Sequence, residues 1–179
     1  MKNEREADRE AAKKGWIKLL LIFLFTAVLA LCKIYVIDFA DVSGQSMYPT
    51  FHSGDTCLEL KSNYTIDRFD VIVVKTESKR LIKRVIGMPN DTVQIIDGKV
   101  LINGKPLQDD LDIRIEKVGC AADPVTLAED EYFVIGDNRN DSLDSRDYGA
   151  FQKSEVCGKI FIRLFPLNKI TTDFSIKKE

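Results

Sequence analysis

The sequence predicts a mainly β domain that follows an N-terminal transmembrane helix. Three observations predict this class: one long apolar segment near the start, a change from helical to strand-like periodicity after Asp38, and turn signals between the later apolar runs. With 179 residues the chain has the length of about one domain, and 45% of its residues are hydrophobic. This composition excludes a disordered chain and a collagen-like repeat.

Charge divides the chain into two parts of opposite sign. The whole chain has 26 basic and 28 acidic residues, which gives a net charge of −2. Residues 1–37 carry a net charge of +3, whereas residues 38–179 carry −5. The chain therefore lacks the basic excess of a nucleic-acid-binding domain, and nucleic acid is not an expected partner.

The apolar segment covers residues 16–37 and contains neither an acidic residue nor a proline. Its 22 residues span about 33 Å as a helix, which is enough for a hydrocarbon core of about 30 Å. Trp16 and Tyr35 stand where interfacial aromatic residues are expected, and Lys18 and Lys33 lie near enough to the ends to reach the lipid head groups. Basic residues precede the segment and acidic residues follow it, so the positive-inside rule places the N-terminus in the cytoplasm.

These features predict a charged cytoplasmic tail at residues 1–15, a single-pass anchor in the cell membrane at residues 16–37, and an extracytoplasmic domain at residues 38–179. A cleaved signal peptide is the competing interpretation. Against a cleaved signal peptide, the sequence has no A-x-A cleavage site at the end of the apolar segment. A lipoprotein signal needs a small residue before its cysteine, but Leu31 stands before Cys32. A buried core helix is the third interpretation, and the charge asymmetry argues against it.

After Asp38, apolar runs rich in Val and Ile alternate with turn signals. Asp97-Gly98 stands between two such runs and is a strong signal for a two-residue hairpin. Residues 105–130 are less regular, and we expect them to form an excursion from the sheet. Repeated short strands without an amphipathic helix predict a barrel or a sandwich. The expected strands are residues 56–60, 70–74, 81–86, 92–96, 99–102, 132–135 and 156–164.

Three segments are too specific in their residues to serve only as scaffold. They are SGQSMYPT at residues 43–50, KRVIGMPND at residues 83–91, and GDNRNDSLDSRDYG at residues 136–149. We call them the serine, lysine and third motifs. In the serine motif, Ser46 stands in a turn punctuated by Gly and Pro. Such a turn can present the hydroxyl and nearby backbone N–H groups to one ligand, which a nucleophilic serine requires.

A nucleophilic serine also needs a base, and the only histidine is His52. Lys83 is the better candidate, because strand alternation puts Leu81, Lys83 and Val85 on one face and so places the ammonium among apolar groups. Burial disfavours the charged form of an amine, so the pKa of Lys83 is expected to fall toward neutrality, as a Ser-Lys dyad requires. The alternative is an ordinary edge-strand lysine whose amine lies in water.

The third motif is rich in polar side chains and has glycine at both ends. Asp144 and Arg146 can form an ion pair, and Ser142 can hydrogen-bond a buried amine and orient it. These properties suit a loop that supports a catalytic lysine. The alternative is a long solvated loop.

Together, and in this order behind one N-terminal anchor, the three motifs closely resemble the type I signal peptidases, the bacterial leader peptidases, in their short Gram-positive-like form. The resemblance implies a β-rich catalytic domain built around a coiled, largely antiparallel sheet. The residues that it assigns are the nucleophile Ser46, the general base Lys83, the supporting residues Ser142, Asp144 and Arg146, and, near the oxyanion and the substrate, Gly44, Met47 and Pro49.

The function that the resemblance implies is a membrane-anchored serine endopeptidase that cleaves signal peptides from secretory preproteins. The implied partners are these signal peptides and the lipid bilayer, with a place near the export translocon. It implies no metal or organic cofactor, and the absence of a C-x-x-C spacing also argues against zinc. Two alternatives stay open: a self-cleaving repressor-like Ser-Lys peptidase, and an inactive membrane-anchored β domain that acts as an adapter or assembly factor.

Two residues depart from the family pattern. Gly44 stands where many enterobacterial-type members have a serine that helps to bind the oxyanion. The oxyanion hole is therefore expected to use the backbone N–H of Ser46 and another main-chain donor. Asn90 replaces the glycine of the family's usual Pro-Gly-Asp turn, and the turn can survive because Asn is among the few residues that tolerate positive φ.

Overall fold

The structure, a computed structural model, describes residues 2–109, 111 and 113–175. It divides into two units, residues 1–37 and residues 38–179. The first unit contains one helix, α1 (Lys2–Tyr35), which runs without interruption through the charged residues and the apolar segment. The helix ends two residues before the end of the expected span, because Ile37 already begins the first strand.

The apolar part of α1 has the properties of a membrane-spanning helix. The most apolar 18-residue stretch within residues 13–35 has a mean hydropathy of 2.4, and none of it is buried. From Trp16 to Tyr35 the helix exposes large apolar side chains such as Phe23, which are favourable in the apolar surroundings of a membrane. The expectation of an apolar N-terminal helix long enough to cross a membrane is confirmed.

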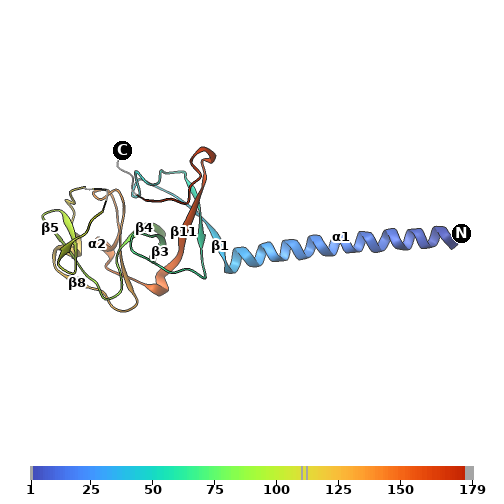
Figure 1. Ribbon diagram of the computed structural model, residues 1–179, viewed down its shortest axis with the longest axis horizontal. Coiled ribbons are helices and arrows are strands. Elements are labelled where there is room, and N and C mark those ends of the chain that lie inside the picture. Colours follow the sequence, from blue (N-terminus) through green and yellow to red (C-terminus); the bar gives the residue numbers. More distant parts are fainter. Residues whose placement is uncertain (1, 110, 112, 176–179) are drawn as a thin grey trace. The chain divides into compact units, whose positions relative to one another are not determined.

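Residues 38–179 form two antiparallel sheets (Figure 1). The larger sheet has the strand order β1-β2-β11-β3-β4-β9-β10, and the smaller has the order β7-β6-β5-β8. The larger sheet contains β1 (Ile37–Asp41), β2 (Thr56–Leu60), β3 (Val71–Lys75), β4 (Arg80–Gly87), β9 (Glu131–Ile135), β10 (Phe151–Gln152) and β11 (Val156–Phe165). The smaller sheet contains β5 (Thr92–Ile96), β6 (Lys99–Ile102), β7 (Lys105–Pro106) and β8 (Val125–Thr126).

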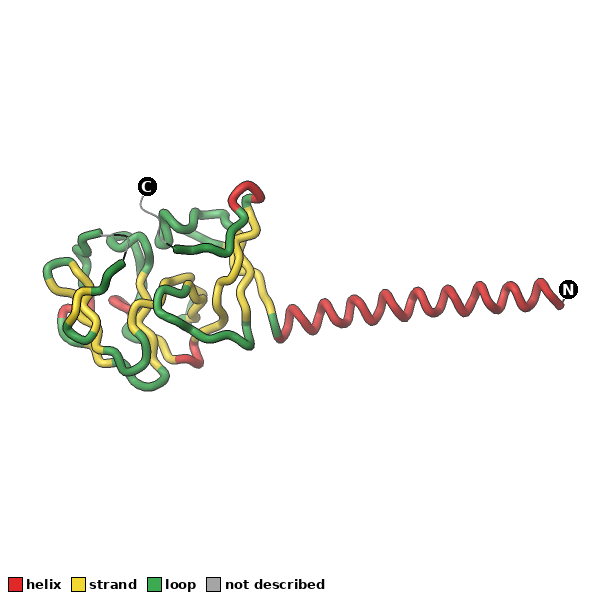
Figure 2. Tube along the Cα trace, viewed as in Figure 1, coloured by secondary structure: helices red, strands yellow, loops and turns green. Residues whose placement is uncertain are grey.

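Among the residues of this unit that the structure describes, helical structure is limited to short turns, and the others form strands and loops (Figure 2). The four turns are η1 (Gly119–Ala122), α2 (Ser145–Tyr148), η2 (Lys153–Glu155) and η3 (Leu167–Lys169). The mainly β, antiparallel class predicted from the sequence is therefore confirmed.

All seven expected strands are present, each within one residue of its expected ends. Four further strands were not expected, and three of these, β7, β8 and β10, have only two residues. A two-residue strand is too short to show an alternating pattern. Within residues 105–130, which were expected to leave the sheet, β7 and β8 belong to the smaller sheet and η1 packs against β5.

The centre of the larger sheet is buried on both faces. On one face of β3, Val71 and Val73 pack with Met47 and Phe51 from the serine motif and the residue after it. On the other face, alternate residues of β3 pack with side chains of β4 and β9. The pairing of β4 with β9 has one register shift, and the pairing of β11 with β2 has two. Such irregularities bend strands, which agrees with a coiled sheet.

Candidate active site

Ser46 lies in the loop between β1 and β2. Gly44 has φ +84°, a conformation that costs glycine little, and it turns the chain just before the serine. After the serine, the N–H of Phe51 donates to the carbonyl oxygen of Met47 at 2.9 Å. The side chains of Met47 and Phe51 are almost completely buried. The loop is thus fixed on the sheet, while Ser46 itself stays only half-buried.

Lys83 reaches Ser46 from strand β4, which lies between β3 and β9. Its Nζ donates to Oγ of Ser46 at 2.6 Å, and its side chain is only 2% exposed. Burial lowers the pKa of Lys83 from 10.5 to about 8, against the opposing effect of the carboxylate of Asp144. An amine with this pKa is partly neutral near pH 7 and can accept a proton.

Ser46 and Lys83 both line a pocket of about 340 Å³, which we call the Ser46 pocket. Lys79, Leu81 and Lys83 stand at alternate positions, so all three face this pocket from one side of the same chain segment. The twelve described residues that line it include Gly44 but neither Met47 nor Pro49. They are Ser43, Gly44, Gln45, Ser46, Lys79, Leu81, Lys83, Lys117, Asn140, Asp141, Ser142 and Leu143.

The third motif is tied directly to the serine loop. The backbone N–H of Asn138 donates to the carbonyl oxygen of Ser46 at 3.0 Å, and its side-chain amide donates to that of Gln45 at 3.2 Å. Gly136 passes so close to Ser46 that an added Cβ would lie 2.5 Å from the Ser46 carbonyl oxygen and would also collide with Ser142. Only glycine allows this approach without displacement of the backbone.

A buried ion pair that the sequence did not lead us to expect joins all three motifs. Arg84 Nε donates to Oδ1 of Asp137 at 2.7 Å, and Nη2 donates to Oδ2 at 2.6 Å. The hydroxyl of Thr50, in the serine motif, donates to the same carboxylate at 2.6 Å. Arg84 and Asp137 are 2% and 0% exposed. The available signal was an arginine in the middle of an apolar strand, because a buried guanidinium needs a carboxylate partner.

The expected pairing of Asp144 and Arg146 is present and fully buried. Nε and Nη2 of Arg146 donate to the two oxygens of Asp144, each at 2.8 Å, and the backbone N–H of Gly136 donates to Oδ2 at 3.0 Å. Burial alone raises the pKa of Asp144, but the hydrogen bonds and charge of Arg146 outweigh it and hold that pKa below its usual value. The pair therefore stays ionised and fixes the third motif.

Ser142 lines the pocket, but it does not hydrogen-bond to Lys83. It is 8% exposed, and its hydroxyl interacts with the carboxylate of Asp144, whose pKa it helps to lower. The amine of Lys83 donates to Ser46 instead.

His52 lies outside the Ser46 pocket. Its ring packs edge-on against Tyr48 with 5.2 Å between the ring centres, and its Nδ1 is buried without a partner in the described part of the chain. Within that part, no group of three or more His, Cys, Asp and Glu side chains is arranged to hold a metal ion. Lys83 is thus the candidate base that the fold brings to Ser46.

The turn at the end of the lysine motif forms with Asn in the place of Gly. Asn90 has φ +67°, and the N–H of Asp91 donates to the carbonyl oxygen of Met88 at 3.0 Å. Asparagine therefore tolerates here the left-handed conformation that glycine usually supplies.

A serine hydroxyl that is hydrogen-bonded to a buried lysine of lowered pKa, at the wall of a pocket in a mainly β domain, has the chemistry that a serine peptidase requires. Sequence comparison agrees with this class. The chain belongs to the signal peptidase, peptidase S26, family, whose sequence model matches residues 13–165.

The chain is similar over most of its length to curated signal peptidases. It is 34% identical to a signal peptidase I of Bacillus amyloliquefaciens and 31% identical to signal peptidase I S of Bacillus subtilis, in each case over 95% of this chain and 98% of the relative. A crystal structure of a signal peptidase I from Enterococcus faecalis is 30% identical and matches with a TM-score of 0.45 over 55% of this chain and 98% of that chain. The resemblance inferred from the three motifs is confirmed at the level of the family.

Proposed function

We propose that this chain is a membrane-anchored serine endopeptidase that cleaves signal peptides from exported preproteins, with Ser46 as nucleophile and Lys83 as general base. The observation that carries the proposal is the 2.6 Å hydrogen bond between Lys83 Nζ and Ser46 Oγ, made by a lysine that is 2% exposed. The relatives named signal peptidase I support the class of substrate.

In the first half of the reaction, neutral Lys83 accepts the proton of Ser46 as Oγ attacks the scissile carbonyl carbon. The carbonyl oxygen becomes an oxyanion, and backbone N–H groups of the loop around Ser46 stabilise it. The ammonium of Lys83 then gives the proton to the leaving nitrogen of the mature chain, and the C–N bond breaks. The signal peptide stays bound to Oγ of Ser46 as an ester.

In the second half, Lys83 is neutral again and accepts a proton from a water molecule that attacks the ester carbon. The tetrahedral intermediate collapses, the bond to Ser46 breaks, and Lys83 returns the proton to Oγ. The signal peptide leaves with a free carboxylate. One lysine serves both halves because it starts each of them unprotonated.

The groups around Lys83 act by positioning it. The Asp144–Arg146 pair holds the third motif, and the Arg84–Asp137 pair holds the strand of Lys83. The hydroxyl of Ser142 lies in the same pocket, where it can accept a hydrogen bond from the Lys83 ammonium after proton transfer.

Substrate selection follows from the strand geometry of an extended peptide. Side chains at −1 and −3 of the cleavage site point the same way and enter the same surface. Small side chains, usually Ala, fit a shallow pocket there, and bulky ones are excluded by steric clash. The pocket cannot strongly separate Ala from Gly or Ser, because one methyl or hydroxyl group is worth only about 1–3 kcal/mol.

The helix α1 anchors the enzyme in the cell membrane with its N-terminus in the cytoplasm and residues 38–179 outside. The basic residues before the apolar segment and the acidic residues after it support this orientation. An enzyme and a preprotein held in one bilayer near the export translocon meet at a raised effective concentration.

The test uses a serine-reactive fluorophosphonate probe on the full chain in detergent, followed by incubation with a model preprotein. We expect labelling of wild type and none of Ser46→Ala, and we expect processing of an Ala −1 substrate but not of a Leu −1 substrate. An inactive adapter would show neither labelling nor processing. A self-cleaving peptidase would shorten its own chain at a rate independent of protein concentration and leave the preprotein intact.

A further inference from the structure

The C-terminal segment, residues 166–175, follows β11 and folds back against it. The turn η3 reverses the chain, and Thr171 pairs with Arg163 of β11 in an isolated antiparallel bridge. The family model matches the chain only as far as residue 165, so the family match does not include this segment. The contacts of Arg163 and Phe174 lead from this segment to the serine loop, residues 42–55 between β1 and β2.

Arg163 holds the serine loop with one side-chain nitrogen and the C-terminal segment with another. Its Nη1 donates to the carbonyl oxygen of Thr50 at 2.8 Å and to Oδ2 of Asp55 at 3.2 Å. Its Nε donates to the carbonyl oxygen of Lys169 at 2.9 Å. The side chains of Arg163 and Asp55 are 13% and 4% exposed, so water competes little for these hydrogen bonds.

Phe51, the residue after the serine motif, packs against the same two partners. The centre of its ring lies 5.0 Å from that of Phe174 and 5.7 Å from the guanidinium carbon of Arg163. Phe51 is completely buried in one cluster with Met47 and Val73, and Phe174 packs against this cluster. The C-terminal segment thus supplies part of the core beneath the serine loop.

Thr50 connects these contacts to the strand that carries the lysine. Its carbonyl oxygen accepts from Arg163. Its hydroxyl donates to Oδ2 of Asp137 at 2.6 Å and accepts from Nη2 of Arg84 at 3.2 Å. Arg84 follows Lys83 on β4. The backbone of Thr50 is therefore fixed from the C-terminal segment, and its side chain is fixed from the strand of Lys83.

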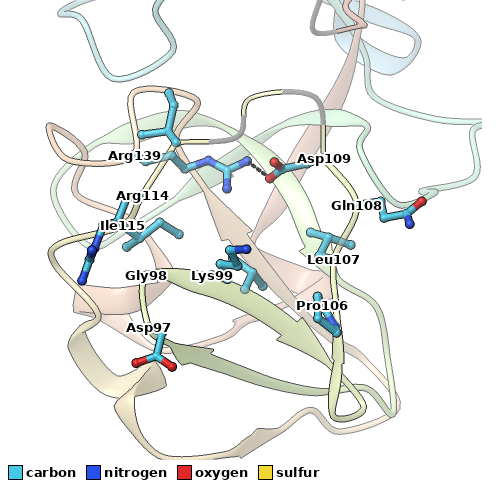
Figure 3. Close-up of a pocket in the computed structure, with 12 residues that line it drawn as sticks. Asp97, Gly98, Lys99, Pro106, Leu107, Gln108, Asp109, Arg114, Ile115 and Arg139 are labelled. Atoms are coloured by element: carbon cyan, nitrogen blue, oxygen red, sulfur yellow. Dashed lines mark ion pairs between the residues drawn. The ribbon is translucent and has the colours of Figure 1, made fainter.

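The third motif, which also lines the Ser46 pocket, is held by a different set of charges. Arg139 lines a second cavity, of about 470 Å³, and forms an ion pair with Asp109 at 2.6 Å (Figure 3). Nη1 of Arg146 donates to the carbonyl oxygens of Arg139 and Lys117. No residue of the C-terminal segment takes part in these contacts. A change in that segment is therefore expected to act on the serine loop and not on the third motif.

We propose that Arg163 and Phe174 are positioning residues for Ser46. The C-terminal segment and Arg163 together fix the serine loop, and so keep Oγ of Ser46 at 2.6 Å from Nζ of Lys83. The proposal rests on the proposed role of Ser46 as nucleophile. Because a displacement of about 1 Å in a reacting group can lower a rate about a hundredfold, a loosened serine loop slows acylation even where the domain stays folded.

The kinetic test compares full-length variants in detergent with the peptide substrate and the fluorophosphonate probe. We expect Phe174→Ala to lower kcat and the rate constant of labelling by about tenfold each. KM should stay within about twofold of wild type, because no residue of the C-terminal segment lines the Ser46 pocket. Phe174→Leu keeps an apolar side chain against Phe51 and should recover most of the rate. Leu167→Ala is the matched control, because Leu167 belongs to the same segment and is 74% exposed, and it should behave as wild type.

Two comparisons separate positioning from stability and from charge. A residue that only stabilised the fold would lower the amount of protein that the probe labels and leave the rate constant of labelling unchanged. Arg163→Lys keeps the positive charge, but its single nitrogen cannot reach Thr50, Asp55 and Lys169 together. We therefore expect Arg163→Lys to be as slow as Phe174→Ala, and wild-type rate constants in Arg163→Lys would contradict its part in the proposal.

Hydrogen exchange measured by mass spectrometry tests the same packing independently of activity. The N–H of Phe51 donates to the carbonyl oxygen of Met47, so it is protected while the serine loop stays in place. Peptides that cover residues 43–56 should exchange at least about fivefold faster in Phe174→Ala, and those that cover residues 92–102 of the smaller sheet should not change. Unchanged exchange of the serine loop, or wild-type kinetics of Phe174→Ala, would overturn the proposal. A protein whose serine loop is loosened by Phe174→Ala but which cleaves nothing would contradict only the proposed function.

Discussion

The activity is expected to rise steeply with pH between 7 and 9. Burial lowers the pKa of Lys83 to about 8, while the nearby carboxylates of Asp144 and Asp137 partly oppose this and Lys79 adds to it. With a pKa of about 8, the neutral amine makes up about one-tenth of the enzyme at pH 7 and about nine-tenths at pH 9. Only the neutral amine can accept the proton of Ser46, so kcat/KM should increase by about ninefold over this interval.

The assay measures kcat/KM of the full chain in detergent with a fluorogenic peptide substrate from pH 6 to pH 10. A second arm uses Lys79→Glu, because Lys79 lines the pocket and its positive charge disfavours the ammonium of Lys83. A carboxylate at this position favours the ammonium, so the midpoint of the profile should move to higher pH. Lys153→Glu makes the same change of charge at an exposed position outside the pocket and should leave the midpoint in place.

Either of two results would refute the reasoning. One is a kcat/KM that does not change with pH, and the other is a midpoint of the pH profile near 6.5 that Lys79→Glu does not shift. The second result is the one expected of a histidine base, whose unperturbed pKa is about 6.5. Lys83→Arg should be inactive at every pH, because a guanidinium stays protonated throughout this range.

Four further predictions address positioning, stability, the base and topology. Gly136→Ala should lower kcat/KM by more than about tenfold in the peptide assay, because its Cβ would lie 2.5 Å from the carbonyl oxygen of Ser46 and displace the nucleophile; unchanged kinetics would contradict the close approach. Asp144→Asn should lower the free energy of unfolding by about 3–5 kcal/mol in urea melts, because a buried guanidinium loses its counterion. His52→Ala should keep kcat/KM within about twofold of wild type, since a base must lie within reach of the proton it removes. Protease added to intact protoplasts should digest residues 38–179, and protection of these residues would reverse the proposed orientation.

Most of the secondary structure of the β unit could be predicted from the sequence. The strand from Thr92 to Ile96 was predicted to the residue, because the buried Val93 and Ile95 alternate with Gln94 and so show the period of two that burial against a sheet imposes. The hairpin at Asp97-Gly98 was equally legible, since both residues have the positive φ that its tight turn requires. The strand from Ile37 to Asp41 was missed because the apolar run of the helix continues into it.

Only part of the candidate site could be predicted from the sequence. The motifs named Ser46 and Lys83, and strand alternation predicted the burial of the lysine. The partnership of Arg84 with Asp137 was missed, because the two residues are 53 positions apart in the chain. Nothing in a local pattern says which of several aspartates will meet a given arginine.

The sequence by itself determined the apolar helix, the positions of the longer strands along the chain and the residue types available for catalysis. Only the tertiary structure decided that Ser46 and Lys83, 37 residues apart, meet at 2.6 Å, and that Ser142 lacks the hydrogen bond expected of it. The physical reason is that periodicity and turn propensity act over a few neighbouring residues. A contact between distant residues depends on how the core packs, here on Met47 and Phe51 beneath the serine loop and on the paired charges that hold the third motif in place.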